Sequence, residues 1–463
     1  MLSKALIEDL ITAALSTGGD FAEIFVEDKL TTNISLVGGV VEDSVSGRDS
    51  GIGIRIFQGV NSVYAYTNEH EREKLLRLAR QAAQAIRGAG PQDRVLNLMR
   101  SYGGNIHPVR VIPQDVPHAR KVAVMREAYD AAKAYSEEVS QVTVRYLDED
   151  QHVLVANSEG TWAEDRRIRT RLPIQAVATD GKEMQTGFYG PGAHMGFEFF
   201  DAVDIKHKAR EAARIAVTML HAEPCPSGKF PVIIDNEFGG VIAHEACGHG
   251  LEATSVAKKA SVFADRLGEK LAPDIVTLID DGTHPGAWGS QNMDDEGAPT
   301  RRNVLIENGV LKGYLIDKLN GRRMGMAPTG SGRRESYKFA PTSRMTNTYI
   351  DSGTSTPEEI IANTEFGLYA RYMGGGSVMP ATGEYNFAVN EGWLVENGKI
   401  TRPVRGATLI GTGLQTLQKI DMVAGNLAHG QGMCGSQSGS IPTNVGQPMI
   451  RVSELTVGGR KGK

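Results

Sequence analysis

The sequence predicts an α+β fold, with an N-terminal helix and strand domain at residues 1–225 and a β-rich C-terminal domain at residues 226–463. Three observations lead to this prediction. At 463 residues the chain is too long for one ordinary hydrophobic core. Helical spacing of apolar residues dominates the first half, whereas short extended runs between glycines dominate the second. Between the halves, Pro224 and Pro226-Ser227-Gly228 mark a domain boundary.

In the N-terminal domain, helices and strands alternate along the chain. The first helix is predicted at residues 2–17, where apolar side chains recur every three or four positions until Gly18-Gly19 ends it. The same periodicity predicts further helices at 69–87, 117–136 and 203–221. Short extended runs predict strands at 21–26, 32–37, 53–57, 141–147 and 152–156.

The segment Trp162–Arg171 combines strand-like alternation with a high density of charge. Such a pattern is more typical of a strand with a solvated face than of a binding patch. We therefore expect its acidic and basic side chains to face water.

The C-terminal domain begins with a short buried strand at 230–234, and the histidine-bearing helix follows from about residue 237. Asn308-Gly309 and Asn397-Gly398 each separate two extended runs, which predicts two hairpins, and we expect both to belong to one sheet system. One further helix is predicted at 357–363, with Thr356 as its N-cap and Pro357 in its first turn.

Composition and charge narrow the classes of function. Charged residues make up 23% of the chain and apolar residues 40%, and the net charge is −5, which argues against a nucleic-acid surface as the main function. No run of about 18 apolar residues is present, so we expect no membrane span. The N-terminus does not have the pattern of a signal peptide, and three cysteines in so long a chain fit a reducing cytoplasm.

The most informative motif is His244-Glu245-Ala246-Cys247-Gly248-His249. Two imidazoles suit zinc or iron, and a glutamate beside a metal-bound water can take its proton as that water attacks a carbonyl. The histidines are five residues apart, whereas four would place them on one helical face. On a regular helix the second ring is rotated by roughly 140°, so either the helix ends near Gly248 or a bulge inserts one residue.

A catalytic metal needs a third protein ligand, and the residues alone leave several candidates. These candidates are Glu252, Asp265, His284, His429 and Cys434. Cys434 lies in a glycine-rich stretch from which a thiolate could reach a metal, whereas Cys247 fits a small apolar filler better than a ligand.

Two other kinds of segment could carry function. Asp294-Asp295-Glu296-Gly297 lacks the alternate ligand spacing of a calcium loop, so a solvated turn is the better interpretation. The glycines of Gly330–Gly332 and Gly374–Gly376 belong either to ordinary loops or to places where a substrate backbone approaches closely.

The chain resembles the TldD branch of the TldD/PmbA family of metallopeptidases, once described as modulators of DNA gyrase. The residues that carry this resemblance are His244-Glu245-Ala246, Gly248–Glu252, Asp281-Gly282-Thr283, Asp294–Gly297, Asn303–Gly309, Met324–Met326, Gly332–Tyr337, Met345–Tyr349, Gly406–Gly411, Cys434-Gly435 and Leu455–Gly459. They span essentially the whole second half of the chain.

The resemblance implies that His244, His249 and Cys434 bind Zn²⁺, with iron as an alternative, and that Glu245 is the catalytic base. It also implies a cytoplasmic peptidase that cleaves unfolded or extended peptides. Its partner would be a second copy in a homodimer or a PmbA-type subunit in a heterodimer, with no direct contact to nucleic acid or membrane.

Two alternatives remain open from the sequence. One is a non-catalytic peptide-binding or gyrase-modulating protein whose metal is structural, with His429 as a possible fourth ligand. The other is an enzyme that removes small acyl groups, because two histidines, one cysteine and one glutamate also form the deformylase kind of site.

Overall fold

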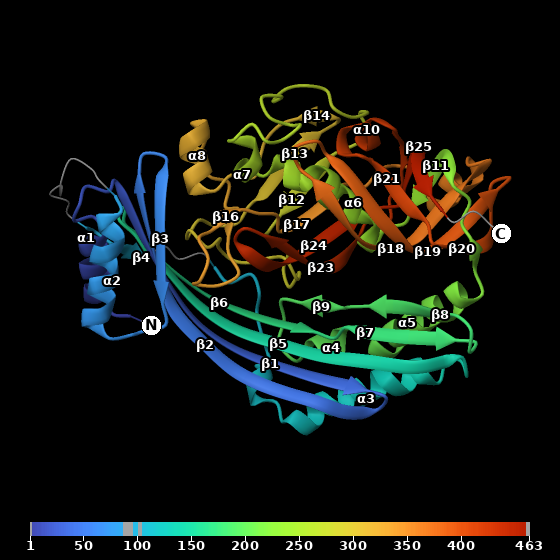
Figure 1. Ribbon diagram of the computed structural model, residues 1–463, viewed down its shortest axis with the longest axis horizontal. Coiled ribbons are helices and arrows are strands. Elements are labelled where there is room, and N and C mark those ends of the chain that lie inside the picture. Colours follow the sequence, from blue (N-terminus) through green and yellow to red (C-terminus); the bar gives the residue numbers. More distant parts are fainter. Residues whose placement is uncertain (1, 87–95, 101–103, 460–463) are drawn as a thin grey trace.

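The computed structural model describes residues 2–86, 96–100 and 104–459. Within these ranges the chain has a mixed α+β structure with a β-rich C-terminal half, which confirms the predicted fold class. Long curved strands of the first half lie beneath the C-terminal half, and α1 and α2 lie at one end of them (Figure 1).

The first sheet is formed by the N-terminal half. Its described strands are β1 (Phe21–Val37), β2 (Val40–Gln58), β3 (Asn61–Thr67), β4 (Met99–Arg100), β5 (Val139–Asn157), β6 (Thr161–Arg171), β7 (Ile174–Thr179), β8 (Met184–Tyr189) and β9 (Gly192–Ala193). The main strand order is β3-β2-β1-β5-β6-β4, with β7 joined to β5, β8 joined to β7 and β9 joined to β6.

Two predicted strand pairs are single long strands. The runs 21–26 and 32–37 both belong to β1, and the runs 141–147 and 152–156 both belong to β5. β1 pairs antiparallel with β2 on one side and with β5 on the other. Because both edges of β1 are hydrogen-bonded, this strand continues through its polar middle. The pattern of apolar residues alone predicts a break there.

The helices of this half cover one face of the sheet. They are α1 (Lys4–Ala14), α2 (Arg72–Gln84), α3 (His118–Lys133), α4 (Phe199–Ala202) and α5 (Ile205–Leu220), with a short 3₁₀ turn at Pro113–Asp115. α1 and α2 pack on apolar residues of β1 and β2, and α3 and α5 pack on those of β5 and β7. Among the described helices, none is long and apolar enough to cross a membrane.

The opposite face of the sheet contacts the C-terminal half and is highly charged. In β6, the predicted alternation is present, with Glu164 and Arg166 exposed. However, Asp165, Arg167 and Arg169 are only 8%, 3% and 4% exposed, so the expected solvated face is wrong for these three residues. They are buried because loops of the C-terminal half cover them and supply their partners.

The C-terminal half contains two larger sheets and a two-stranded one. The eight-stranded sheet consists of β10 (Glu223–Pro224), β11 (Gly228–Ile234), β18 (Phe366–Met379), β19 (Glu384–Glu396), β20 (Lys399–Arg405), β21 (Thr408–Thr412), β22 (Ile420–Val423) and β25 (Ile450–Gly458). β21 pairs with both β25 and β19, so part of this sheet closes on itself.

The six-stranded sheet positions the candidate site. Its order is β14 (Val310–Leu311), β13 (Arg302–Glu307), β12 (Leu278–Asp281), β17 (Asn347–Ile350), β24 (Gly439–Gln447) and β23 (Ala428–Ser436). The two-stranded sheet is β15 (Gly332–Arg333) with β16 (Thr342–Ser343). The remaining α-helices in the described part are α6 (Val241–Ala243), α7 (Ala253–Val256), α8 (Lys318–Met324), α9 (Pro357–Ala362) and α10 (Gly413–Gln418).

The turn chemistry of the second half matches the local predictions. Asn308 and Asn397 both have positive φ values, and they connect β13 to β14 and β19 to β20. The two hairpins belong to different sheets, so the expectation of one sheet system is wrong. At α9 the Thr356 side chain accepts from the backbone N–H of Glu359, and the Glu359 side chain accepts from that of Thr356, which forms a capping box.

Candidate metal centre

The segment that carries both histidines follows directly after β11. The chain leaves the buried end of this strand and passes through a 3₁₀ turn, Glu237–Gly240, into α6. A Cβ atom at Gly240 would lie 2.5 Å from the backbone of Gly446 in β24. The absence of a side chain at this position lets the segment pack directly against the β23–β24 hairpin.

Residues His244–Gly248 form a π-helical turn, in which the N–H of His249 donates to the carbonyl oxygen of His244. Because this bond spans five residues, it brings side chains at i and i+5 to the same side of the turn. The two imidazole centroids lie 5.1 Å apart, with the rings at 86°. The sequence allows either a helix that ends near Gly248 or a bulge with one inserted residue, and the structure contains the bulge.

Gly248 lets this turn pack closely against the fully buried Met345 side chain. A Cβ atom at Gly248 would lie 2.1 Å from Sδ of Met345. We expect Gly248→Ala to destabilise the protein by about 1–3 kcal/mol through overpacking. Chemical denaturation measures the loss. In the double variant Gly248→Ala/Met345→Ala the two losses should be less than additive, and full additivity would contradict this packing explanation.

Cys434 approaches the histidines from β23, 185 residues beyond His249. Its Sγ atom lies 3.3 Å from Nε2 of His244 and 3.3 Å from Nε2 of His249. In the described part of the chain, these three residues are the one set of three or more histidine, cysteine and acidic ligands whose donor atoms lie within 4.8 Å of one another. A tetrahedral zinc ion keeps its sulfur and nitrogen ligands roughly 3.5 Å apart, so this donor set fits such an ion.

The charge state of the cluster also suits a metal. Burial raises the pKa of Cys434, but the neighbouring imidazoles of His244 and His249 outweigh it and lower that pKa to about 3. The thiolate is the form that binds metals. Cys247 is different, because its burial without such partners raises its pKa to about 12. This agrees with the interpretation of Cys247 as an apolar filler.

Glu252 orients one of the imidazoles. Its Oε2 atom lies 3.0 Å from Nδ1 of His249, which leaves Nε2 of that ring directed at Cys434. Burial lowers the pKa of His249, yet Glu252 and Cys434 outweigh it and hold this pKa well above its ordinary value. Glu252 therefore lies one contact away from the cluster, as expected for a residue that positions a metal ligand.

Glu245 lies beside the cluster without belonging to it. Its Oε2 atom is 3.6 Å from Nε2 of His249, and its side chain is 23% exposed. The carboxylate thus lies next to the cluster and is partly exposed, which makes it a candidate for a proton acceptor.

Arg344 is a residue of the site that sequence reasoning missed. Its fully buried guanidinium donates to the carbonyl oxygens of Cys434 and Gly439 and lies 3.9 Å from Glu252. It therefore connects the hairpin that carries Cys434 to the residue that orients His249. Arg344 directly precedes Met345–Tyr349, one of the stretches that carry the family resemblance, and this position was the signal in the sequence that could have indicated its role.

The other ligand candidates lie elsewhere. Asp265 is exposed and pairs with Lys259. The rings of His284 and His429 pack against each other, with centroids 5.7 Å apart, and both contact Tyr349. His429 thus does not join the cluster in the described structure, and a fourth protein ligand from this position is not formed.

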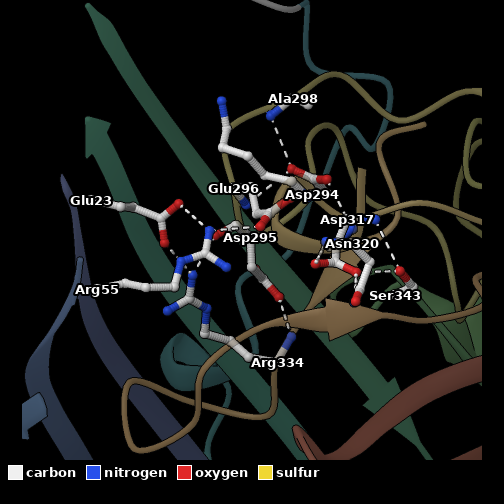
Figure 2. Close-up of polar contacts among 12 residues, drawn as sticks. Glu23, Arg55, Asp294, Asp295, Glu296, Ala298, Asp317, Asn320, Arg334 and Ser343 are labelled. Carbon is white, nitrogen blue, oxygen red and sulfur yellow. Dashed lines mark hydrogen bonds and ion pairs between the residues drawn. The ribbon is translucent and has the colours of Figure 1, made fainter. Parts of the chain in front are cut away.

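The acidic segment Asp294–Glu296 is buried, so the predicted solvated turn is wrong. Its three carboxylates are between 0% and 4% exposed. Figure 2 shows that Glu296 meets Arg55 of β2, and the Nη2–Oε1 distance is 2.6 Å. Asp295 pairs with Arg167 of β6 at 2.6 Å. The segment is therefore a connection between the two halves of the chain.

The glycines near residue 330 also serve the protein's own packing. Gly330 has a φ of +71°, and a Cβ atom there would lie 2.4 Å from the carbonyl oxygen of Pro299. Gly332 pairs with Ser343 in the two-stranded sheet. In the second segment, Cβ atoms at Gly374 and Gly376 would likewise lie 2.4 Å and 2.1 Å from other atoms of the chain, whereas Gly375 is exposed with open space where a Cβ would lie. Close approach of a substrate backbone therefore stays a prediction only for Gly375.

Comparison with protein families gives one consistent result across the chain. Residues 22–86 match the PmbA/TldA metallopeptidase domain 1, residues 112–220 match the central domain, and residues 227–459 match the C-terminal domain. The predicted boundary between residues 225 and 226 stays a prediction.

Named relatives are similar over nearly their whole length. A protein named metalloprotease TldD homolog from Haemophilus influenzae is 35% identical over 457 residues, which cover 95% of this chain and 93% of that protein. An archaeal protein from Methanothermobacter thermautotrophicus, named metalloprotease, is 34% identical and covers 95% of this chain and 96% of its own length.

Solved structures share the fold. A putative modulator of a DNA gyrase from Thermotoga maritima superimposes with a TM-score of 0.79 at 22% identity, covering 98% of this chain and 100% of that one. TldE from Thermococcus kodakarensis gives a TM-score of 0.75 at 19% identity, with 98% and 99% covered.

Proposed function

The chain belongs to the PmbA/TldD family of metallopeptidases and is a peptide hydrolase, and from this premise we propose that it is a zinc-dependent peptidase that cleaves unfolded or extended peptides with Glu245 as its base. The observation that carries the proposal is the convergence of Nε2 of His244, Nε2 of His249 and Sγ of Cys434. Three protein ligands leave one position open, which is the arrangement of catalytic zinc sites.

The role proposed for each residue follows from its position. His244, His249 and Cys434 would hold the ion, which when bound supplies Lewis acidity that lowers the pKa of water and polarises a carbonyl group. Glu245, 3.6 Å from His249, takes the proton of the attacking water and passes it to the leaving amine. Glu252 keeps His249 in the tautomer whose Nε2 faces the cluster.

The nature of the substrate is supported by accessibility. His244 is 2% exposed and Cys434 is 6% exposed, so the cluster is recessed, which favours a flexible peptide over a rigid folded protein as substrate. A flexible, extended peptide can enter such a site. We propose that the working assembly is a homodimer or a heterodimer with a PmbA-type subunit, and that it acts in the cytoplasm, where three unpaired cysteines are stable.

The proposal is tested by incubating metal-analysed protein with a mixture of unfolded peptides and identifying the products by mass spectrometry. New internal cuts are expected that disappear with a chelator and return with zinc. Small acylated amides tested in parallel distinguish a deformylase-like activity. Absence of cleavage by fully zinc-loaded protein, both alone and with a PmbA-type partner, would contradict the proposal and favour a structural metal in a binding protein.

The proposed ligand set makes a separate prediction about metal affinity. Cys434→Ser should weaken zinc binding by roughly 100-fold or more, because even residues that only orient ligands change metal affinity by 10–100-fold. Competition with a chelating dye measures the affinity. Cys247→Ala is the matched control, since its thiol belongs to the hydrophobic core and should not affect zinc binding. Equal affinities for both variants would remove Cys434 from the ligand set.

A further inference from the structure

A cavity of about 640 Å³ lies between the N-terminal sheet and the C-terminal half. Strands β1, β5 and β6 form one wall, and the β23–β24 hairpin together with the segments around Trp288 and Arg333 forms the other. This volume falls within the range of ordinary small-molecule and peptide pockets. None of the functions assigned above uses it.

The cavity is strongly basic although the whole chain has a net charge of −5. Seven cationic side chains line it, against four acidic ones. Asp148 is neutralised by Lys121, which lies outside the lining, at 2.6 Å, and Arg334 is likewise paired with Glu23 at 2.7 Å. Asp295 pairs with Arg167, which is one of the seven cations, so this pair leaves the excess unchanged. An excess of positive charge therefore faces the space.

Three of the lining arginines have no carboxylate within 4.0 Å among the described residues. These are Arg145, which is exposed, and the more enclosed Arg171 and Arg333. Arg171 donates to the carbonyl oxygens of Gly190 and Gln431 and lies over the ring of Trp288.

Arg333 is the more unusual of the two. It is 2% exposed, donates to the carbonyl oxygens of Met345 and Pro442, and has no partner for its Nε atom. Burial and the nearby guanidinium of Arg169 lower the pKa of Arg333. A buried cation without a counterion is unfavourable, and a perturbed group that lines a cavity is a candidate for a ligand-binding site.

The cavity adjoins the candidate metal centre through one strand. Met433 and Pro442 face each other across the β23–β24 hairpin and both line the cavity, whereas the next residue, Cys434, lies 3.3 Å from the histidines. Successive side chains of a strand point to opposite faces, so the cavity and the cluster lie on the two faces of β23, which is the edge strand of its sheet. An extended peptide rises about 3.3 Å per residue, so a peptide that passes this edge can have its scissile bond at the cluster and a residue a few positions away in the cavity.

We propose that this cavity binds a carboxylate of the peptide substrate through Arg171 and Arg333, so that the enzyme prefers peptides that present a carboxylate there to peptides that present a neutral or basic group. The inference rests on the proposed peptidase function. The carboxylate comes either from an aspartate or glutamate side chain or from the C-terminus of the peptide. A guanidinium group without a carboxylate partner suits both sources, because its planar N–H donors match the oxygens of a carboxylate.

The test measures binding apart from turnover, so that a failure of the inference is distinguished from a failure of the proposed function. Zinc-loaded Glu245→Gln protein is titrated with four fluorescein-labelled decapeptides, and anisotropy gives each Kd. One peptide is uncharged and amidated, the second has the same sequence with a free C-terminus, and the third and fourth are amidated and carry two glutamates or two lysines. We expect at least one carboxylate-bearing peptide to bind ten-fold or more tightly than the uncharged peptide, and the lysine peptide to bind more weakly than it.

Arginine variants connect this preference to the cavity. In the Glu245→Gln background, Arg171→Gln and Arg333→Gln should each reduce the ratio of acidic to neutral affinity towards one. Arg402→Gln is the matched control, because Arg402 is an exposed arginine whose acidic partners Glu223 and Glu396 lie outside the cavity. Circular dichroism verifies that each variant is folded. If Arg333→Gln protein does not fold, Arg171→Gln protein alone is sufficient for the test.

Three results would overturn the inference. They are equal affinity for all four peptides, a preference that persists in folded Arg171→Gln protein, and an equal loss of preference in Arg402→Gln protein. If instead acidic peptides bind preferentially but wild-type protein cleaves none of them, the cavity assignment stands and the proposed peptidase chemistry fails.

Discussion

Glu245→Gln protein is expected to retain zinc and to lose peptide cleavage, with kcat reduced by roughly 10²–10⁴-fold. The amide preserves the size of the side chain but cannot accept the proton of the attacking water. Zinc binding should persist because Glu245 lies outside the ligand set and only approaches His249 at 3.6 Å. The measurement is kcat on an unfolded peptide, with the zinc content of the same preparation.

Glu252→Gln is the matched comparison, because this glutamate also contacts His249 but through Nδ1. Its loss should weaken zinc affinity by about 10–100-fold and leave activity recoverable at high zinc. The two glutamates are thus distinguished by whether added metal restores turnover. Full turnover by zinc-loaded Glu245→Gln protein would exclude Glu245 as the base.

Local signals in the sequence were sufficient for most of the secondary structure. Caps and asparagine-glycine turns act over a few residues, so Thr356 and Asn397 were interpreted correctly from their neighbours alone. The assignment of two hairpins to one sheet failed because strand order depends on contacts between segments that are far apart in the chain.

The candidate site also has a part that local sequence predicts and a part that depends on contacts between distant segments. His244, Glu245 and His249 lie within six residues, and their spacing allows either an early end of the helix or an inserted residue, of which the structure contains the second. The third member of the cluster could not be selected from the residues alone, because Cys434 is distant in sequence and several other side chains carry equivalent chemistry. The family resemblance pointed to Cys434, and the fold places it beside both imidazoles.

The main error of the sequence analysis was to predict that buried charged residues face water, and this error has a physical cause. Alternation of charged and apolar residues shows that a strand has two different faces, but it does not show whether the charged face meets water or another part of the protein. In β6 and in the segment Asp294–Glu296, opposite charges from the two halves meet and exclude water. The signal that could have indicated this was the presence of matching charges in both halves, such as Glu23 in β1 and Arg334 beyond β15.

Glu23→Gln should produce the largest loss of stability among the variants considered, about 3–5 kcal/mol. Glu23 is 0% exposed, and its two oxygens lie 2.7 Å from Nη2 of Arg55 and 2.7 Å from Nη2 of Arg334 (Figure 2). A neutral amide leaves these buried guanidiniums without part of their countercharge. Denaturation by urea at neutral pH, monitored by circular dichroism, measures the loss.

The dependence on pH provides a second, independent check of this role. Burial raises the pKa of Glu23, but Arg55 and Arg334 outweigh it and hold that pKa below its ordinary value of 4.5. The carboxylate therefore contributes stability above pH 4.5, and this contribution is lost as the pH falls through the lower pKa of the folded state. The difference in stability between wild type and Glu23→Gln should accordingly shrink as the solution is acidified below pH 4.5.

Glu454→Gln, which removes an exposed partner of Lys419, should leave the denaturation midpoint unchanged at every pH. A difference between wild type and Glu23→Gln that stays constant down to acidic pH would contradict the role of Glu23 as a buried counterion.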